Sequence, residues 1–243
     1  MQGPRASLAE MVNRIERLSP LASEDRAALL SLPYSLRSHG PGVHLIRDGE
    51  RAEQCNVLLS GFAHRYKLTG DGGRQIIAVH LTGECIDLQN ALLARADHSV
   101  QTLTQVEVAV LPQQALRDLA FSRPAIARAL WIDTLVDASI FREWVVNVGR
   151  RDSRARVAHL LCEFSLRLER AGLAHNHCYD LPMTQEQLAD AVGLTSVHVN
   201  RVLRQLAEEQ LIVRERRSVR IRDWQQMRAA GDFNERYLHL DAK

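Results

Sequence analysis

The stretch from Thr184 to Ile221 constrains this chain most, because it combines two short amphipathic segments with a glycine between them. Thr184 and Gln187 have the spacing of a capping box, which predicts the start of a helix. Gly193 predicts the end of that helix, because glycine readily adopts the left-handed conformation of a tight helix exit. Thr195 is then the expected cap of a second helix. Two short helices joined by such a turn are typical of a helix-turn-helix motif.

The second predicted helix, over about 195–208, carries polar residues that suit DNA recognition. In a helix-turn-helix this helix enters the major groove with its N-terminus first. Arginine can bind guanine, and asparagine can bind adenine, through two hydrogen bonds each. We expect Arg201 to contact a base, helped by Ser196, His198 and Asn200, and the other polar residues to position phosphates. The predicted DNA-binding residues are Thr184, Thr195, Ser196, His198, Asn200, Arg201, Arg204, Arg216 and Arg217.

Apolar runs at Leu211–Val213 and Val219–Ile221 flank a polar turn at 216–218, which predicts a β-hairpin, the wing of a winged helix. Residues 195–222 contain seven arginines and three glutamates, a net charge of +4, whereas the whole chain has a formal charge of +2. A basic patch on a nearly neutral protein is typical of a surface that binds phosphates. A solvated helical hairpin with incidental arginines is disfavoured, because caps, glycine, apolar face and basic hairpin all agree.

These residues resemble the C-terminal domain of the Crp/Fnr family of bacterial transcription regulators, most closely over Leu181 to Arg222. The segment Arg150–Ala158 is also similar to the family's hinge into its DNA-binding domain. The resemblance implies a homodimer that binds a palindromic operator in double-stranded DNA and acts with RNA polymerase. The chain departs from the best-known members at one reading position, where many carry a glutamate and this chain has Val197. The arginine four residues later is kept, as Arg201.

Length and composition fit an ordinary globular protein of two domains. The sequence has no apolar run long enough to span a membrane, and its opening residues do not form a signal peptide. Its four cysteines include no Cys-x-x-Cys pair, and the N-terminal cysteine cluster of an Fnr-type iron–sulfur site is absent. We therefore predict a cytoplasmic protein with no membrane partner and no metal site.

Short β-rich runs alternate with glycine-containing turns from Tyr34 to Leu111, which predicts a small antiparallel barrel or roll. The glycine placement resembles the cyclic-nucleotide-binding β-roll of the same family, so the resemblance spans roughly Ser31 to Ile221. The predicted fold class is α+β: an N-terminal antiparallel β-roll, a long dimerisation helix and a C-terminal winged helix-turn-helix. The predicted domains are 1–123 for the roll with its N-terminal helices, 124–149 for the dimerisation helix and 150–243 for the DNA-binding domain.

The effector pocket that the resemblance implies is degenerate. Cyclic-nucleotide binders of the family hold the ligand with a glycine, a glutamate, an arginine and a serine or threonine, where this chain has Asp87, Leu88, His98 and Ser99. Leu88 cannot accept a hydrogen bond, neutral His98 cannot replace a bidentate arginine, and Asp87 repels an anion. We therefore expect neither cyclic AMP nor cyclic GMP as the effector. Asp87 and His98 could instead pair with each other and rigidify an empty pocket.

Two other functions remain open at this point. Histidine and cysteine can ligate haem iron or zinc, so a haem- or redox-dependent gas sensor on the same DNA-binding frame is the alternative function. The residues concerned are His44, His64, His80, His98, Cys55 and Cys85. None of their spacings is diagnostic of a metal, so no cofactor is predicted. An enzyme would need a catalytic cluster, and the candidates His80, Glu84, Cys85, Asp87 and His98 match no catalytic motif, so no enzyme is predicted.

A long helix is predicted from Pro124, because apolar residues recur every four residues and no helix breaker appears until Gly149. About 26 residues at about 1.5 Å each give roughly 39 Å, which is longer than the roll needs for cover. A helix packed wholly on its own roll is one reading, but the resemblance implies that it pairs with its twin across the dimer axis. The predicted dimerisation residues are Ile132, Val136, Ile140, Trp144 and Val148.

Overall fold

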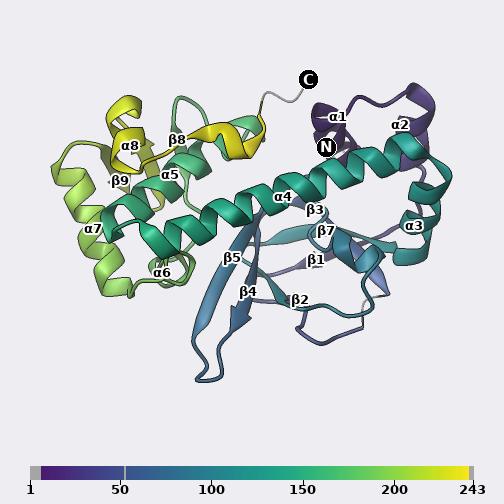
Figure 1. Cartoon of the computed structure of the whole chain (residues 1–243), viewed down its shortest axis with the longest axis horizontal. Helices are drawn as coiled ribbons and strands as arrows, with labels where there is room; N and C mark the ends of the chain where they lie inside the picture. Colours follow the sequence, from purple (N-terminus) through teal and green to yellow (C-terminus); the bar gives the residue numbers. More distant parts are fainter. Residues whose placement is uncertain (1–6, 52, 241–243) are drawn as a thin grey trace, which may run out of the picture. The chain divides into compact units, whose positions relative to one another are not determined.

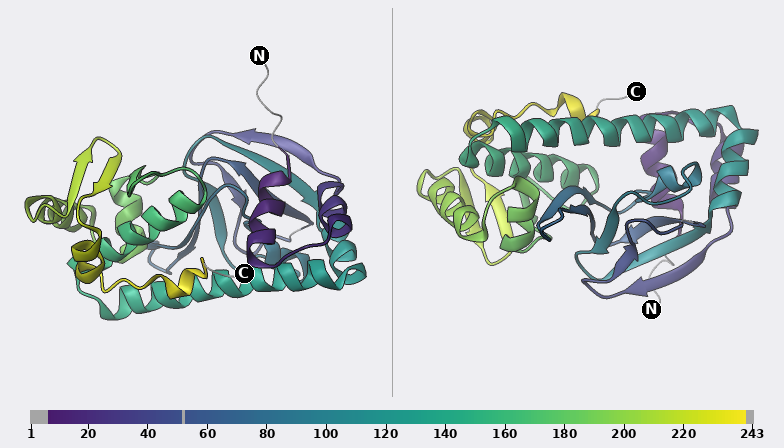
Figure 2. Two further views of the ribbon diagram at one scale, coloured as in Figure 1. Left: turned by 90° about the horizontal axis from the view of Figure 1, so that it is seen from above. Right: turned by 60° about the horizontal axis from the view of Figure 1, so that its bottom comes forward.

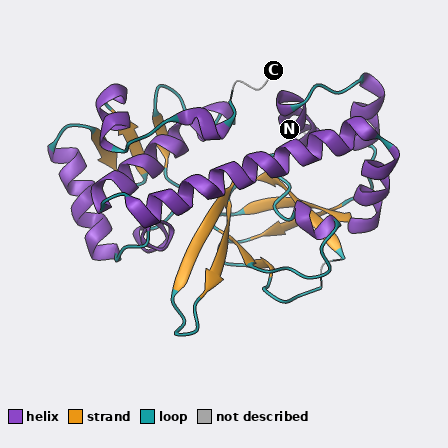
Figure 3. Cartoon of the chain, viewed as in Figure 1, coloured by secondary structure: helices purple, strands orange, loops and turns teal. Residues whose placement is uncertain are grey.

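The computed structural model describes residues 7–51 and 53–240, so the prediction about a signal peptide concerns residues outside the described part. The chain divides into two compact units, one made of the residues up to 67 with 78–138, the other of 68–77 with 139–240. Within the described residues, no helix is both long enough and apolar enough to cross a membrane. The first unit combines two β-sheets with helices, and the second combines helices with short strands (Figure 3).

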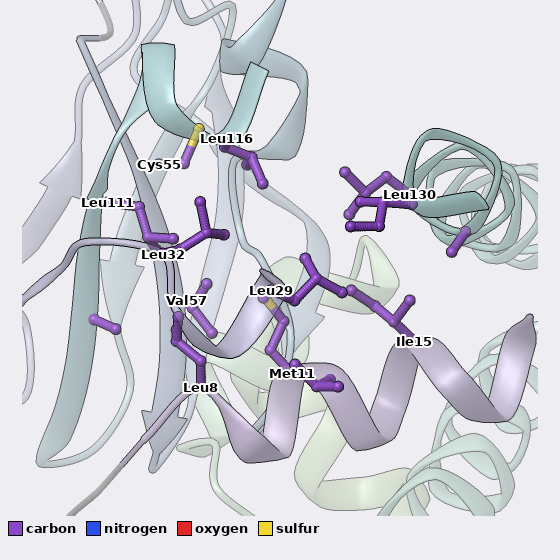
Figure 4. Close-up of a cluster of buried hydrophobic side chains, with 14 of the residues drawn as sticks. Leu8, Met11, Ile15, Leu29, Leu32, Cys55, Val57, Leu111, Leu116 and Leu130 are labelled. Atoms are coloured by element: carbon purple, nitrogen blue, oxygen red, sulfur yellow. The ribbon is translucent and has the colours of Figure 1, made fainter. Parts of the chain in front are cut away.

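The first unit contains a three-stranded antiparallel sheet with helices packed on one face. The strands lie in the order β1 (Ser35–His39), β7 (Val106–Pro112) and β3 (Gln54–Ser60), and the helices are α1 (Ala9–Leu18), α2 (Ser23–Leu30) and α3 (Gln113–Ser122). Successive side chains of a strand point to opposite faces. Cys55 and Val57 therefore join the cluster that includes Met11, Ile15 and Leu116 from the helices (Figure 4). This face forms the larger core of the unit.

The other face of the same sheet closes the roll. A second sheet has the order β2 (His44–Ile46), β6 (Ser99–Thr102), β4 (Ala63–Leu68) and β5 (Arg74–His80). Leu58 and Val108 from the first sheet pack with Ile46 and Val100 from the second, so a second apolar cluster lies between the sheets. A short 3₁₀ helix, η1 (Leu88–Ala91), follows β5. The antiparallel β-roll predicted from the strand and turn pattern is thereby confirmed.

The long helix α4 runs from Pro124 to Arg150 (Figure 1). Its predicted interface residues do not form its exposed face. Val136 and Trp144 are buried within the chain, and Ile132, Ile140 and Val148 are half-buried. The prediction of Val136 and Trp144 as dimerisation residues is therefore corrected, whereas Ile132, Ile140 and Val148 stay predictions. The apolar side chains that α4 exposes are Trp131, Leu135, Phe141, Val145 and Val146.

The second unit holds the helix-turn-helix. Its helices are α5 (Ser153–Arg170), α6 (Gln185–Val192), α7 (Ser196–Glu208) and α8 (Trp224–Ala230). Asp152 caps α5 by accepting a hydrogen bond from the N–H of Ala155 at 2.9 Å. The wing strands β9 (Ile212–Glu215) and β10 (Ser218–Ile221) follow α7 in the chain and are yellow-green in Figure 2. The helices and the hairpin thus occur where the sequence predicts them.

A third strand completes the wing sheet, in the order β8-β10-β9. This strand, β8 (Cys178–Asp180), lies in a polar segment whose sequence shows no strand pattern. Tyr179 pairs with Val219 of β10, is buried, and donates a hydrogen bond from its hydroxyl to the carbonyl of Leu161 at 2.7 Å. The strand forms because distant partners hold it.

The C-terminal tail packs onto α5 through the 3₁₀ helix η2 (Glu235–Leu238). The hydroxyl of Tyr237 donates to the carboxylate of Glu163 at 2.8 Å, and the indole N–H of Trp144 donates to the same oxygen at 2.9 Å. Leu238 is buried. The buried Glu163 carboxylate therefore links the tail to the end of α4.

Candidate nucleic-acid interface and the degenerate effector pocket

The two helices of the motif begin and turn as the sequence predicts. The hydroxyl of Thr184 accepts from the N–H of Gln187, and the Gln187 side chain accepts from the N–H of Thr184, which completes the capping box. Gly193 ends α6 in the left-handed region, at φ 65°. Thr195 caps α7 by accepting from the N–H of His198 at 3.2 Å. Thr184 and Thr195 therefore fix the helix starts, which places them beside any phosphate bound there.

The inner face of α7 is apolar and anchors the helix. Val199, Val202, Leu203 and Leu206 are all buried. Removing a side chain such as Leu203 from a core of this kind costs about 2–5 kcal/mol. Because this face is fixed, the opposite face of α7 is presented to solvent as a rigid surface.

That opposite face forms a hollow of about 470 Å³ on the second unit. Residues four apart on a helix lie on one side of it, and the hollow collects four of the predicted DNA-binding residues in this way. It is lined by Gln185, Ser196, Val197, Asn200, Arg201 and Arg204. Gln185, the first residue of α6, and Val197 were not among the predicted contact residues. The sequence itself could have indicated Gln185, because this residue directly follows Thr184, which caps the helix that supports α7.

Hydrogen bonds orient the polar side chains in the hollow. The amide of Asn200 donates to the side-chain oxygen of Gln185 at 2.9 Å, and Arg204 donates to the Asn200 oxygen at 3.3 Å. One guanidinium nitrogen of Arg201 lies 3.0 Å from Nε2 of His198. Asn200 retains one free N–H and one free lone pair, and Arg201 retains most of its five donors. These are the groups that pair with adenine and guanine edges in a major groove.

The wing places a second group of basic residues beside the start of α6. Arg216 and Arg217 form the two-residue turn between β9 and β10, with Arg216 in the left-handed region at φ 56°. Together with Thr184, Gln185 and Arg214 they line a pocket of about 160 Å³. Seven of the nine predicted residues thus line two hollows that share Gln185, whereas Thr195 and His198 line neither of them.

The arginines of residues 195–222 are available for an anion. Among the residues that the structure describes, none of these seven arginines forms an ion pair with a carboxylate. Glu209, an acid of this segment, is instead bound by Arg154, and the hydrogen bond from Arg154 lowers the pKa of Glu209. Because Glu209 is already paired, it does not compete with an anion for these arginines, and the surface of α7 and the wing stays positively charged. Such a surface suits a polyanion.

The four residues at the implied nucleotide positions do not converge on one pocket. Asp87 is buried and accepts two hydrogen bonds from Asn56, each at 2.6 Å. Burial raises the pKa of Asp87 to about 7, against the opposing effect of those bonds. His98 is bound to Asp97, at 2.6 Å, so the suggested Asp87–His98 pair is wrong. Ser99 accepts from the N–H of Asp48 at 3.1 Å.

A different set of side chains fills the space between the roll and α4. Arg14 lies 2.7 Å from Asp133 and 3.7 Å from Glu84, and Arg65 lies 2.9 Å from Asp137. The space left beside these groups is about 30 Å³, enough for about one water molecule. Of the four positions at which the family holds a nucleotide, Leu88 alone lines this space.

The roll's candidate haem or catalytic ligands have partners within the chain. His44 lies 2.7 Å from the hydroxyl of Tyr66, and His80 lies 3.0 Å from Glu84. Burial lowers the pKa of both His80 and His98, which favours their neutral forms. Over residues 7–51 and 53–240, no group of three or more histidine, cysteine, aspartate or glutamate side chains is arranged to hold a metal ion.

Comparisons with known proteins cover both units. The profile of the Crp-like helix-turn-helix domain matches residues 155–230, and the profile of the cyclic nucleotide-binding domain matches residues 36–123. The transcriptional activator protein FnrL of Cereibacter sphaeroides is 26% identical over 218 residues, covering 88% of this chain and 87% of FnrL. The nitrogen fixation regulation protein FixK of Rhizobium meliloti is 27% identical over 210 residues, covering 85% of this chain and 89% of FixK.

The fold agrees with these sequence relatives. The structure of FixK2 from Bradyrhizobium japonicum superposes with a TM-score of 0.75 at 25% identity, covering 82% of this chain and 98% of FixK2. Regulators of this kind bind DNA and act as dimers, and they are not enzymes. The winged helix-turn-helix, the β-roll and the long helix between them therefore identify the chain as a member of the Crp/Fnr family of DNA-binding transcription regulators.

Proposed function

We propose that this regulator binds a palindromic operator as a homodimer, with α7 of each subunit in the major groove. The observation that carries the proposal is the hollow on α7, where Asn200 and Arg201 present free donors and acceptors from a helix fixed by its buried inner face. Arg201 is the main base-contacting residue, and Ser196, His198 and Asn200 assist it. Thr184, Thr195, Arg204, Arg216 and Arg217 position phosphates.

The exposed apolar face of α4 is the proposed dimer seam. Alternating steps of four and three residues, the spacing of a coiled-coil seam, connect four apolar residues and one arginine: Trp131, Leu135, Ala138, Arg142 and Val145. Trp131 is 69% exposed, Leu135 51% and Val145 53%. A row of this kind on a soluble monomer is unfavourable in water, and a second copy of the same helix covers it. Two recognition helices then lie about 34 Å apart, one turn of DNA.

Neither cyclic AMP nor cyclic GMP is the proposed effector. The space beside α4 contains two arginines and three carboxylates that already pair with one another, and it leaves no volume for a nucleotide. An incoming phosphate would have to displace Asp133 or Asp137 from its arginine and then face the freed carboxylate. Any signal that does act would shift the population of the DNA-binding state through the segment 150–152.

Selection of bound sites from random duplex DNA, at one stated salt concentration, tests the proposal. We expect a palindrome whose half-sites lie about one helical turn apart, 10–10.5 base pairs. Binding that depends on salt but not on sequence would contradict the assignment of α7 as the reading helix. Including cell extract in a parallel selection separates a missing effector from a missing reading function, because only the former is restored by extract.

We further propose that the protein works in the cytoplasm, with RNA polymerase as its partner in transcription, and without a resident haem or metal. The paired states of His44, His80 and His98 support the absence of a haem ligand in the roll. An absorption spectrum of protein expressed with added haem tests this point. A Soret band that copurifies with the protein would instead favour the haem-dependent gas sensor.

A further inference from the structure

Val197 is the most exposed large hydrophobic side chain among the described residues, at 79%. A single exposed valine on a protein surface needs no special explanation. This one, however, is the second residue of α7 and lines the same hollow as Asn200 and Arg201. An apolar side chain therefore stands among the groups that are proposed to read base edges.

We propose that Val197 reads a thymine, by packing against its 5-methyl group in the major groove. This inference rests on the proposed docking of α7 and adds the identity of a base that it selects. Thymine is the base that presents a methyl group in the major groove, whereas the other base edges there present hydrogen-bonding groups. Valine has no hydrogen-bonding group in its side chain, so apolar contact is the means by which it distinguishes bases.

The backbone favours such a contact. A β-branched side chain in a helix is largely restricted to one rotamer, so Val197 loses little conformational entropy on binding. Its position near the N-terminus of α7 is the part of a recognition helix that reaches base edges. Glutamate at this position would instead accept a hydrogen bond from the amino group of cytosine. The departure from the family's glutamate therefore changes which base is selected.

The neighbouring side chains limit where the thymine lies. Asn200 is oriented by Gln185 and Arg204 so that one N–H and one lone pair remain, the pair of groups that adenine requires. Val197 and Arg201 are four residues apart, about 6 Å along the helix axis, and base pairs are about 3.4 Å apart. The half-site therefore has a thymine, an adenine and a guanine within about three consecutive base pairs, on either strand.

Replacing that thymine with deoxyuridine tests the contact, because the exchange removes the methyl group and leaves the hydrogen-bonding edges unchanged. The full-length protein is titrated against the selected operator and against its deoxyuridine form, at one salt concentration. We expect the wild-type protein to bind the deoxyuridine operator about fourfold more weakly per half-site, the equivalent of one buried carbon group. The V197A variant should bind both operators with affinities that differ much less.

The V197E variant gives an independent readout. Repeated site selection should replace the thymine with cytosine, and the discrimination against thymine should reach roughly 5- to 150-fold. Because Val197 is exposed, both variants should fold, and circular dichroism checks that they do. Equal wild-type binding to the thymine and deoxyuridine operators, or a palindrome without thymine near the guanine and adenine, would overturn the inference alone. Sequence-blind binding by the wild-type protein would overturn the proposed function itself.

Discussion

Asn56 donates two hydrogen bonds to the carboxylate of Asp87, one from its backbone N–H and one from its side-chain amide, each 2.6 Å long. The two residues join β3 to the start of η1. Burial nevertheless raises the pKa of Asp87 to about 7, so that the carboxyl group is close to half-protonated at neutral pH. The ordinary pKa of an aspartate in an unfolded chain is about 3.9.

A pH dependence of stability follows from this difference. A group whose pKa is raised by folding contributes stability below its unfolded pKa, and that contribution is lost as the pH rises through the folded value. Asp87→Asn cannot titrate, so its free energy of unfolding should rise relative to wild type by on the order of 3 kcal/mol between pH 4 and pH 8. Denaturant unfolding followed by circular dichroism at both pH values measures this change. Glu107→Gln controls for removing one negative charge, and an Asp87→Asn difference that did not vary with pH would contradict the assignment.

Arg201 and Arg217 should respond differently to the same truncation. Arg201→Ala removes a base contact, so it should cost about 1–3 kcal/mol on the preferred operator and blunt the sequence preference. Arg217→Ala removes a phosphate contact from the wing, so it should weaken binding about equally on all sequences and reduce the salt dependence. Titrations of both variants against operator and scrambled duplexes, at several salt concentrations, distinguish the two roles. An Arg201→Ala variant with unchanged preference would show that α7 docks differently.

The exposed face of α4 should control the oligomeric state. Leu135→Glu puts a charge into the proposed seam, where burial of an unpaired carboxylate costs several kcal/mol, so this variant should be monomeric and should bind a palindrome no better than a half-site. Phe121→Glu on α3 removes an even more exposed apolar side chain outside the seam and should leave the dimer intact. Sedimentation velocity measures both. A dimeric Leu135→Glu protein would locate the interface elsewhere.

His159 should make the C-terminal unit sensitive to acid. Burial and the nearby Arg151 lower the pKa of this buried histidine to about 4, and its neutral ring lies between the carbonyl of Gly231 and the hydroxyl of Tyr237. A histidine whose pKa is lowered by folding contributes stability above its unfolded pKa of about 6.5, and this is lost as the pH falls toward 4, by roughly 3 kcal/mol.

His159→Gln should remove that dependence, so the gap in unfolding free energy between wild type and variant should shrink as the pH falls from 7 to 4. Fluorescence of Trp144 and Trp224, which both belong to this unit, reports the unfolding. Tyr237→Phe is the matched control, because it removes the hydroxyl partner and keeps the titratable ring. A gap that stays constant over the pH range would show that His159 is not the acid-sensitive group.

Cyclic nucleotides should not affect the protein. With cyclic AMP or cyclic GMP at millimolar concentration, we expect neither a change in melting temperature nor a change in operator affinity, because Arg14 and Arg65 are already paired with carboxylates. Thermal unfolding and operator titration with and without nucleotide measure both effects. A nucleotide-dependent rise in melting temperature would mean that the ion pairs open to admit a phosphate.

The two helices of the DNA-binding motif could be predicted from the sequence, because the residues that specify each helix end lie within a few positions of it. The Thr184 capping box and the Gly193 helix exit each depend on neighbours in sequence. The strand β8 depends instead on Val219 of β10, about 40 residues away, so no local pattern could reveal it. Asp87 and Leu88 are likewise neighbours in sequence, yet they line different pockets, which the sequence pattern could not show.

Two of the predicted dimerisation residues, Val136 and Trp144, are buried within the chain for a geometric reason. Residues at every fourth position, from Ile132 to Val148, were taken as one face, but four residues turn an α-helix by about 40° more than one full turn. Over 16 residues the set drifts by about 160°, and it crosses the side where Val136 and Trp144 are buried. Alternating steps of four and three residues keep to one side, and they select Trp131, Leu135 and Val145 instead.

The exposed seam on α4 also sets how the proposed regulator responds to its own abundance. If operator binding requires a pair of subunits and free monomers predominate, the amount of the pair grows with the square of the subunit concentration. Doubling the synthesis of the protein would then raise operator-bound protein by about fourfold, until the sites fill. The apolar row from Trp131 to Val145 would thereby turn a modest change in expression of its own gene into a steeper change at its targets, even without a small-molecule signal.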